Sequence, residues 1–531
     1  MRNDTHLLGR LVRRGRRASM NDVAPHTTLP GLDSEMTFWT GGVVVITSVM
    51  VGLVVLMLGG LPVEWGVTLL AGLLLLLVVA IIPVRQRFLE AALMLSFGAN
   101  IDYHIGHDPT HLVSPSGVPV SVTGLVVGAL WLWWACERWG RRQRSMSLGG
   151  LGVPLVGLWA SAIISTLGAP QPRFGLYALV NLAYFTLLFL YLAQTVSTPE
   201  HLRFLLKWLM IGIVVTSVVG LAEYHLQRNG ALAILGMLGD ENKQTLASSD
   251  LVRIGGLLGS SNGLAWALAE ILPLMLALFF CRASGYNRVF LFGGVTVCVL
   301  ALISTYSRGG WVAFGVAFIL LILFMGSRRF GIAERGWRAK VVLLGVFLAV
   351  AATPLYGNVY TRLTEDDRGS AYARVLMMKV ALRMIEDHPL FGVGLNNYER
   401  VMDEYDGPPE RIHQDFPWPV HNIYLHTTAE VGLLGGGFFV LFALLALWQG
   451  LRAARTDDLF LRAVALGLSM GLVAYLLVGM KELGSLGNGR FFWLAVGLLV
   501  ATRRLSEAGQ HDQSQPVRKN AGARHLLPLS R

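Results

Sequence analysis

The chain has 531 residues, of which 54% are hydrophobic and only 15% are charged. A soluble domain usually carries about 25% charged residues, and one water-soluble core has no room for so many long apolar runs. These values exclude an ordinary soluble protein and predict an all-α polytopic membrane protein, because each span needs roughly 20 apolar residues to cross the hydrocarbon layer.

The net charge of +11 does not indicate a nucleic-acid partner, because the basic residues lie in short links between apolar segments, as membrane topology predicts. The three cysteines, Cys136, Cys281 and Cys298, show no CxxC or CxxH spacing, so we expect neither a disulfide nor a zinc site. We expect no metal and no cofactor.

Residues 1–37 form a polar segment with six arginines, which does not have the pattern of a cleaved signal peptide. A transmembrane domain of about 12–14 helices follows over residues 38–503, and a polar tail, expected to be disordered, covers residues 504–531. The predicted spans are 38–59, 64–83, 88–101, 119–136, 149–167, 174–195, 203–223, 263–281, 288–306, 309–326, 339–356, 421–449, 460–480 and 490–503.

The basic residues predict the orientation. With an even number of spans and a cytoplasmic N-terminus, 30 of the 44 Lys and Arg residues lie on the cytoplasmic side, and half of the remaining 14 lie in one long loop, residues 357–420. We therefore expect a multi-pass membrane protein with both termini in the cytoplasm and the long loops on the outer side.

The long loop 357–420 contains a predicted amphipathic helix over residues 370–386. Val375, Met378, Leu382 and Ile385 recur there at helical spacing, with charged residues between them. We expect this helix to lie along the membrane surface.

Four basic residues on separate segments are predicted at the same outer boundary of the membrane: Arg253, Arg308, Arg374 and His421. A guanidinium group offers a planar set of donors that suits diphosphate oxygens, and a histidine can take a proton from an attacking hydroxyl. Each residue alone is more simply explained as a headgroup contact or a helix cap. Together they indicate a metal-independent transfer from a diphosphate-linked donor.

Three further polar residues lie near this boundary. Asn422, His426 and Glu430 share one face of a helix by their spacing of four residues. Glu430 either orients His426 or satisfies a neighbouring helix, and Asn422 supports the site. Glu270, within the span 263–281, is interpreted as a packing partner.

Four stretches in chain order resemble the superfamily of O-antigen ligases and polymerases, which are bacterial envelope proteins. The resemblance covers about residues 250–440 and follows motifs of that family. The stretches are Arg253–Ala265; Ser307–Ala313; Arg374 with Met384–Tyr398; and His421–Leu425 with Glu430–Gly435. Ser261 departs from the family's usual proline, and Leu376–Met378 from its usual aromatic residue.

The resemblance implies a multi-pass glycosyltransferase of the bacterial inner membrane that takes a glycan from undecaprenyl diphosphate on the periplasmic face, by an inverting mechanism. The acceptor would be lipid A–core, another glycan or a protein hydroxyl, and membrane lipids would surround the site. His421 resembles the family's essential histidine and Arg374 its loop arginine. Either Arg308 or Arg253 matches its other essential arginine, and both are expected to bind the diphosphate.

Two alternatives remain open from the sequence. A polymerase that joins lipid-linked repeats differs from a ligase only in its acceptor. A transporter or flippase of lipid-linked sugars belongs to another class, and it predicts inverted repeats and charged residues along a path through the membrane midplane. The basic residues here gather at one face, and no repeat is visible.

Overall fold

A computed structural model describes residues 85–108, 111, 115–139, 148–226, 253–327, 330–331, 336–364, 370–407, 411–412, 416–481 and 489–514. The basic N-terminal segment and the first two predicted spans lie outside the described residues, as do residues 227–252 and the tail beyond Ser514. The chain divides into two units, Met1–Phe88 and Leu89–Arg531, and the second holds almost all of the described residues.

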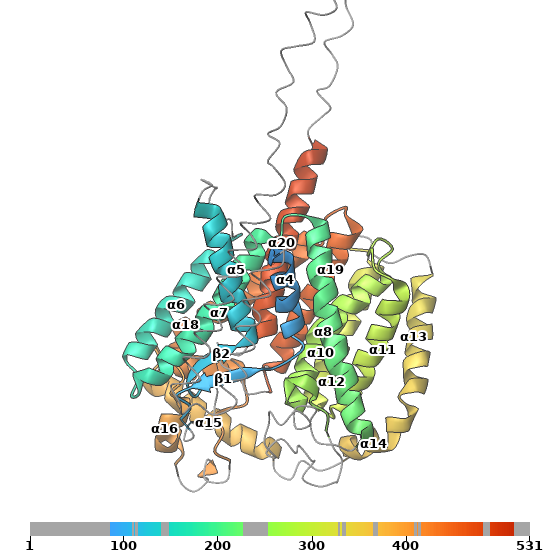
Figure 1. Cartoon of the computed structure of the whole chain (residues 1–531). Helices are drawn as coiled ribbons and strands as arrows, with labels where there is room; N and C mark the ends of the chain where they lie inside the picture. The colour runs from blue at the N-terminus through green and yellow to red at the C-terminus, as the bar shows by residue number, and fades with distance from the viewer. Residues whose placement is uncertain are drawn as a thin grey trace, which may run out of the picture. The chain divides into compact units, whose positions relative to one another are not determined.

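The second unit is a bundle of helices, as Figure 1 shows. Every span predicted from residue 88 onward overlaps a helix of this bundle, which confirms the all-α polytopic class. The helices are α4 (Arg85–Ser96), α5 (Val122–Trp139), α6 (Gly152–Leu167), α7 (Pro172–Thr195), α8 (Pro199–Leu226), α10 (Ser261–Phe280), α11 (Arg288–Ser304), α12 (Arg308–Gly326), α13 (Trp337–Ala351), α18 (Ile423–Ala453), α19 (Leu459–Val478) and α20 (Arg490–Ser514).

Among the described helices, six are long and apolar enough to cross a membrane: α7, α8, α10, α12, α18 and α19. A seventh span results if the bent pair Trp337–Ala351 and Thr353–Thr364, which meets at 48°, counts as one. Helix α20 continues to Ser514, past the predicted end of its span at residue 503.

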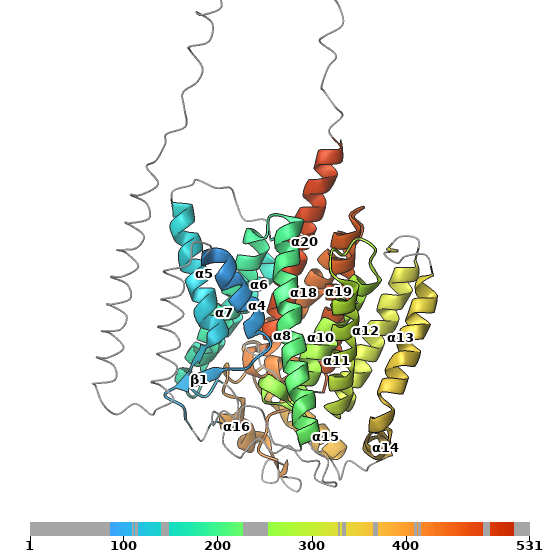
Figure 2. The same ribbon diagram turned by 45° about the vertical axis from the view of Figure 1, so that its right-hand side comes forward.

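One end of the bundle carries short elements. A hairpin of β1 (Asp102–Ile105) and β2 (Val118–Ser121) lies there with α14 (Tyr356–Thr364), α15 (Ser370–Asp387) and α16 (Tyr398–Tyr405), as both views show (Figures 1 and 2). We call it the hairpin end. The strands pair antiparallel, with Asp102 opposite Ser121. The sequence analysis missed this hairpin, because strands of four residues are too short to show a clear alternation.

The predicted amphipathic helix is present as α15, but its buried face differs from the expected one. Val375 and Leu382 are 45% and 46% exposed, whereas Met378 and Ile385 are partly buried and pack against the core, so only half of the predicted apolar stripe packs. A neighbouring face is buried against α16 and the start of α18. Its residues are Ala373, Leu376, Met377, Val380, Ala381 and Met384. Spacing alone did not show which of two adjoining apolar faces the fold would cover.

Helix α18 is broken at Gly432, which has a φ of 73°. The segment after α15 enters at this break. Leu433 donates its backbone N–H to the carbonyl of Pro389 at 2.7 Å, and Val393 donates to the carbonyl of Ala429 at 2.9 Å. A Cβ at position 432 would overlap the carbonyl of Leu390, so only glycine fits. The break fixes α15 relative to the first half of α18.

Helices α10 and α19 approach each other closely through glycine. Gly467 and Gly471 lie four residues apart on α19, and a Cβ at Gly471 would overlap the carbonyl oxygen of Glu270 on α10. Small residues at this spacing permit direct backbone contact between membrane helices. The backbone of α10 is thereby held in place beside Glu270.

Candidate functional site

His421 lies immediately before α18, at the hairpin end. The next residue, Asn422, is the N-cap of that helix: its side-chain oxygen accepts the backbone N–H groups of Tyr424 at 3.0 Å and Leu425 at 3.1 Å. The backbone N–H of Ile423 donates to the carbonyl of Gly479 at 2.8 Å, at the end of α19. The cap and this bond hold the backbone on which His421 sits.

The imidazole of His421 is half-buried, and its Nδ1 lies 3.2 Å from the carbonyl oxygen of Pro419. A carbonyl oxygen only accepts hydrogen bonds, so in this contact Nδ1 carries the proton and Nε2 keeps its lone pair. Burial lowers the pKa of His421, and the positive charge of Arg374 lowers it further. The ring is therefore neutral at pH 7 and suited to accept a proton at Nε2.

Arg374 is half-buried on α15, and its charge acts on the imidazole of His421. The buried face of α15 and the break in α18 bring these two residues together from 47 positions apart in the chain. Within the described residues, we find no hydrogen bond or ion pair that occupies the Arg374 guanidinium. The group is thus available to an anion beside His421.

Glu430 and His426 form a buried pair in the first half of α18. His426 Nε2 lies 3.6 Å from Glu430 Oε1, and both side chains are at most 3% exposed. Glu430 Oε1 also accepts the backbone N–H of Tyr398 at 3.5 Å, and the backbone carbonyl of Glu430 accepts the hydroxyl of Ser165 at 2.6 Å. The sequence analysis offered two partners for Glu430, namely His426 and a neighbouring helix. In the structure Glu430 contacts His426 and also Tyr398 and Ser165.

Arg253 contacts the turn between α11 and α12, which carries Arg308. Arg253 donates from Nε to the carbonyl of Thr305 at 2.9 Å and from Nη2 to the side-chain oxygen of Asn262 at 2.8 Å. Arg308 is the first residue of α12, whose N-cap is Ser307. The charge of Arg374 acts on His421, whereas Arg253 is hydrogen-bonded to the turn that carries Arg308.

A tyrosine-rich cluster adjoins this turn and was missed by sequence reasoning. Tyr306 is fully buried with a φ of 51°. Asn358 on α14 donates to the hydroxyls of Tyr224 at 2.9 Å and Tyr306 at 3.2 Å, and Arg362 donates to the carbonyl of Tyr306 at 3.3 Å. Arg362 is thus a further arginine beside the turn of Arg308. No local sequence signal marks it.

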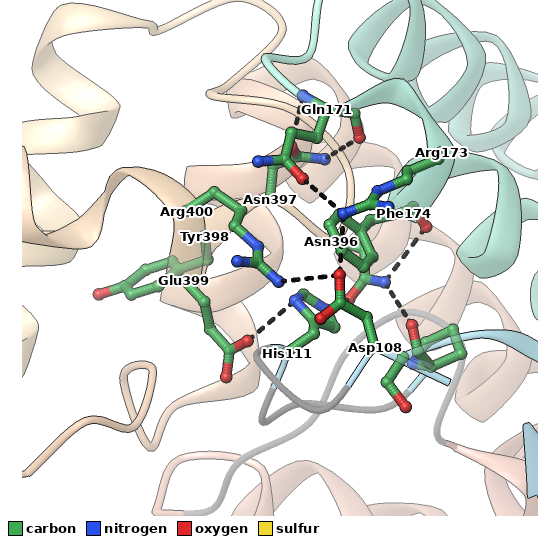
Figure 3. Close-up of polar contacts among 12 residues, drawn as sticks. Asp108, His111, Gln171, Arg173, Phe174, Asn396, Asn397, Tyr398, Glu399 and Arg400 are labelled. Atoms are coloured by element: carbon green, nitrogen blue, oxygen red, sulfur yellow. Dashed lines mark hydrogen bonds and ion pairs between the residues drawn. The ribbon is translucent and has the colours of Figure 1, made fainter. Parts of the chain in front are cut away.

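A second missed cluster, shown in Figure 3, joins the link between β1 and β2 to the start of α7 and to α16. Asp108 pairs with Arg173 at 2.8 Å and with Arg400 at 3.9 Å. His111 Nδ1 lies 3.0 Å from Glu399 Oε2, and both side chains are at most 6% exposed. We call this set, with Asn396, the clamp.

Asn396 lies at the centre of the clamp. Its side-chain amide donates to the carbonyls of Pro115 at 2.9 Å and Phe174 at 3.2 Å, and its oxygen lies 3.3 Å from Nε2 of His111. These bonds hold the segment that enters the break in α18 (Figure 3). The clamp therefore supports the same segment that positions α15, and with it Arg374.

Residues 293–440 match the family model described as O-antigen ligase. The matched region is an O-antigen ligase domain, and it supports the resemblance of the chain to the O-antigen ligase superfamily. No curated protein matches it in sequence. The ligase region contains Arg308, Arg374, His421 and Glu430, but it begins after Arg253, so it is shorter at its start than the resemblance predicted from the motifs.

The family match indicates that this region belongs to a membrane enzyme. Two features of its geometry can take part in chemistry. One is a histidine with an available Nε2 and a lowered pKa, next to an arginine that can receive an anion. The other is an arginine-bearing turn at the start of α12, held by Arg253. A base whose pKa is influenced by a neighbouring anion site suits group transfer from a donor with an anionic leaving group.

Proposed function

We propose that this chain transfers a glycan from undecaprenyl diphosphate to an acceptor hydroxyl, by an inverting mechanism that uses no metal. The reaction takes place at the hairpin end, on the periplasmic side of the bacterial inner membrane. The orientation is supported by the sequence, because the predicted spans would put 30 of the 44 Lys and Arg residues on the opposite side.

The observation that carries this proposal is the pairing of His421 with Arg374. The imidazole is held neutral by burial and by the arginine's charge, with Nδ1 directed to a backbone carbonyl. A general base must be unprotonated at the working pH, and the lowered pKa of His421 meets that need. The same arginine that lowers this pKa attracts the diphosphate, which places donor and base side by side.

The step follows from these positions. Nε2 of His421 takes the proton of the acceptor hydroxyl as its oxygen forms a bond to the anomeric carbon of the donor sugar. The bond between that carbon and the diphosphate oxygen breaks, and its electron pair leaves on the diphosphate. Attack from the side opposite to the leaving group inverts the anomeric centre. Arg374 stabilises the charge that develops on the diphosphate.

The two remaining arginines take different roles in this scheme. Arg308 is assigned to the diphosphate, because it lies at the N-terminus of α12, where helix dipole and backbone N–H groups also favour an anion. Arg253 already donates to Thr305 and Asn262. We therefore assign Arg253 mainly to holding the turn of Arg308. One preorganised charge contact contributes about 3–4 kcal/mol in a transition state.

The proposal is tested with the purified full chain in lipid nanodiscs, supplied with a glycan on undecaprenyl diphosphate and a set of acceptors in EDTA. We expect release of free undecaprenyl diphosphate together with a product whose new linkage has the inverted anomeric configuration by NMR. A retained configuration, or no transfer to any acceptor, including lipid A–core and protein hydroxyls, would contradict it.

The same assay separates ligase from polymerase. If the new bond joins the glycan to lipid A–core or to protein, the enzyme is a ligase. If it joins one lipid-linked repeat to another, the enzyme is a polymerase with the same site. Neither acceptor requires a change in the roles of His421 or Arg374.

A further inference from the structure

A cavity of about 280 Å³ lies at the hairpin end, between the β1–β2 hairpin and helices α5, α7, α10, α19 and α20. None of its lining residues falls within the matched ligase region, 293–440. The cavity is therefore built by parts of the chain to which no role has yet been assigned. Its size is at the lower end of the range for small-molecule sites, which suits a single ring.

Glu270 on α10 lines this cavity, and its side chain is buried, with a residue exposure of 5%. Among the described residues, no hydrogen bond or ion pair to the Glu270 carboxyl is found. An ionisable group inside a membrane bundle costs several kcal/mol unless it is paired or hydrated. Because the backbone of Glu270 touches Gly471 directly, α10 has little freedom to move this carboxyl away. The carboxyl therefore presents acceptor oxygens to whatever fills the cavity.

Aromatic rings form much of the remaining wall. Trp266 lies one helical turn before Glu270, on the same face of α10, and Tyr184 of α7 and Tyr475 of α19 also line the space. Polar side chains also line it, among them Asp102 on β1, Asn181 on α7 and Arg490 on α20. Flat aromatic rings stack on the apolar C–H face of a sugar, while carboxylate and amide oxygens accept hydrogen bonds from its hydroxyl groups.

The cavity is linked structurally to the start of α18. The hydroxyl of Tyr424, three residues after His421, donates to the carbonyl of Leu476 at 2.6 Å. Leu476 follows Tyr475 of the cavity wall, and Ile423 is bonded to Gly479 in the same last turn of α19. The last turn of α19 thus borders the cavity on one side and fixes the backbone beside His421 on the other.

We propose that this cavity is a glycan subsite that binds one pyranose ring, with Glu270 and Asp102 accepting its hydroxyls and Trp266 stacking on its face. The glycan is that of the donor or of the acceptor, so the identity of the substrate rests on the proposed function. The binding of a sugar to the cavity is independent of the proposed function, because binding can be measured without turnover.

Binding is tested by saturation-transfer difference NMR on the full chain in detergent micelles, with the methyl pyranosides of glucose, galactose, mannose and N-acetylglucosamine as probes. We expect at least one probe to bind the wild type and to bind equally to the inactive His421→Ala variant. Glu270→Gln and Trp266→Leu should weaken that binding at least fivefold. The matched controls Glu507→Gln and Trp448→Leu, both exposed near the opposite end, should leave it unchanged.

Asp102→Asn on β1 provides a second variant if the α10 variants do not fold, and it should weaken binding as well. Absence of binding by all four probes would overturn the proposal, and so would equal binding by the wild type and the cavity variants. If the wild type binds a sugar but transfers no glycan, the proposed function fails while the cavity site stands.

Transfer kinetics identify which substrate occupies the site. Glu270→Gln is expected to raise KM for one substrate at least fivefold. A rise for the acceptor assigns the cavity to the acceptor glycan, and a rise for the donor assigns it to the donor glycan. If both KM values stay unchanged, with or without a loss of kcat, the cavity is not a subsite of the reaction.

Discussion

The guanidinium group of Arg374 lies close enough to the imidazole of His421 for its positive charge to lower the pKa of that ring. Arg374 lies on α15 in the long loop, His421 follows directly after that loop, and the packing of α15 on α18 joins the two segments. Their relationship couples the proposed anion site to the proposed base.

This coupling predicts a shift in the pH profile. Because the pKa of His421 is lowered, first by burial and then by Arg374, the active neutral form persists below the ordinary histidine pKa of about 6.5 and is lost as pH falls further. Arg374→Gln removes the charge, so the pKa of His421 rises and the acidic limb of kcat/KM moves to higher pH. Arg374→Lys should largely restore the limb. A limb that does not move in Arg374→Gln would show that the two groups are not coupled.

Gly432→Ala is expected to destabilise the protein and to abolish most of the activity. The residue has a φ of 73°, and an added Cβ would overlap the carbonyl of Leu390, so the inserted segment must move. Strain of this kind costs about 1–3 kcal/mol, measurable as a lower midpoint of thermal unfolding. Gly437→Ala, also on α18, is the control, because a Cβ there meets nothing within 4 Å.

Asn396→Ala tests whether the clamp supports the site. The change removes an amide that donates to two buried carbonyls, and buried groups left without partners cost about 1–3 kcal/mol each. We expect faster hydrogen exchange in the segment that enters the break in α18, together with a slower transfer rate. Arg173→Ala, at a side chain 58% exposed, should cost less than about 1 kcal/mol. Equal effects of the two changes would contradict this role.

Gly471→Ala tests the contact of α10 with α19. The added methyl group would overlap the carbonyl of Glu270 and force the helices apart, so the thermal midpoint should fall. Overpacking of this kind typically costs about 1–3 kcal/mol. Gly293→Ala on α11, where a Cβ meets nothing, should leave the midpoint within experimental error. A harmless Gly471→Ala would mean that the backbones are not in direct contact.

The helices could be predicted from the sequence because the membrane imposes a length and an apolar composition on each span. The helix at residues 370–386 was predicted for a similar reason, since its spacing is local. The buried face of this helix could not be predicted, because the exposed Val375 and Leu382 are as apolar as the residues that pack against α16 and α18. Which of the two faces is covered depends on α16 and α18, which local periodicity does not include.

The site was predicted in part. The motifs singled out His421 and Arg374, and the fold brings these two together. Asn422 was expected to support the site and is the N-cap of α18. The clamp, however, joins His111 to Glu399 across 288 positions, and such contacts leave no local pattern. Glu270 was read as a packing partner because the sequence does not show the cavity beside it.

The most direct test of the account is the initial rate of glycan transfer from undecaprenyl diphosphate by His421→Ala, measured beside the wild type and the control His107→Ala at equal amounts of folded protein. His107 is exposed at the hairpin end. Loss of a general base predicts a decrease of about 100- to 10,000-fold for His421→Ala, with little change for His107→Ala. Transfer by His421→Ala at the wild-type rate would contradict the central claim that this histidine activates the acceptor.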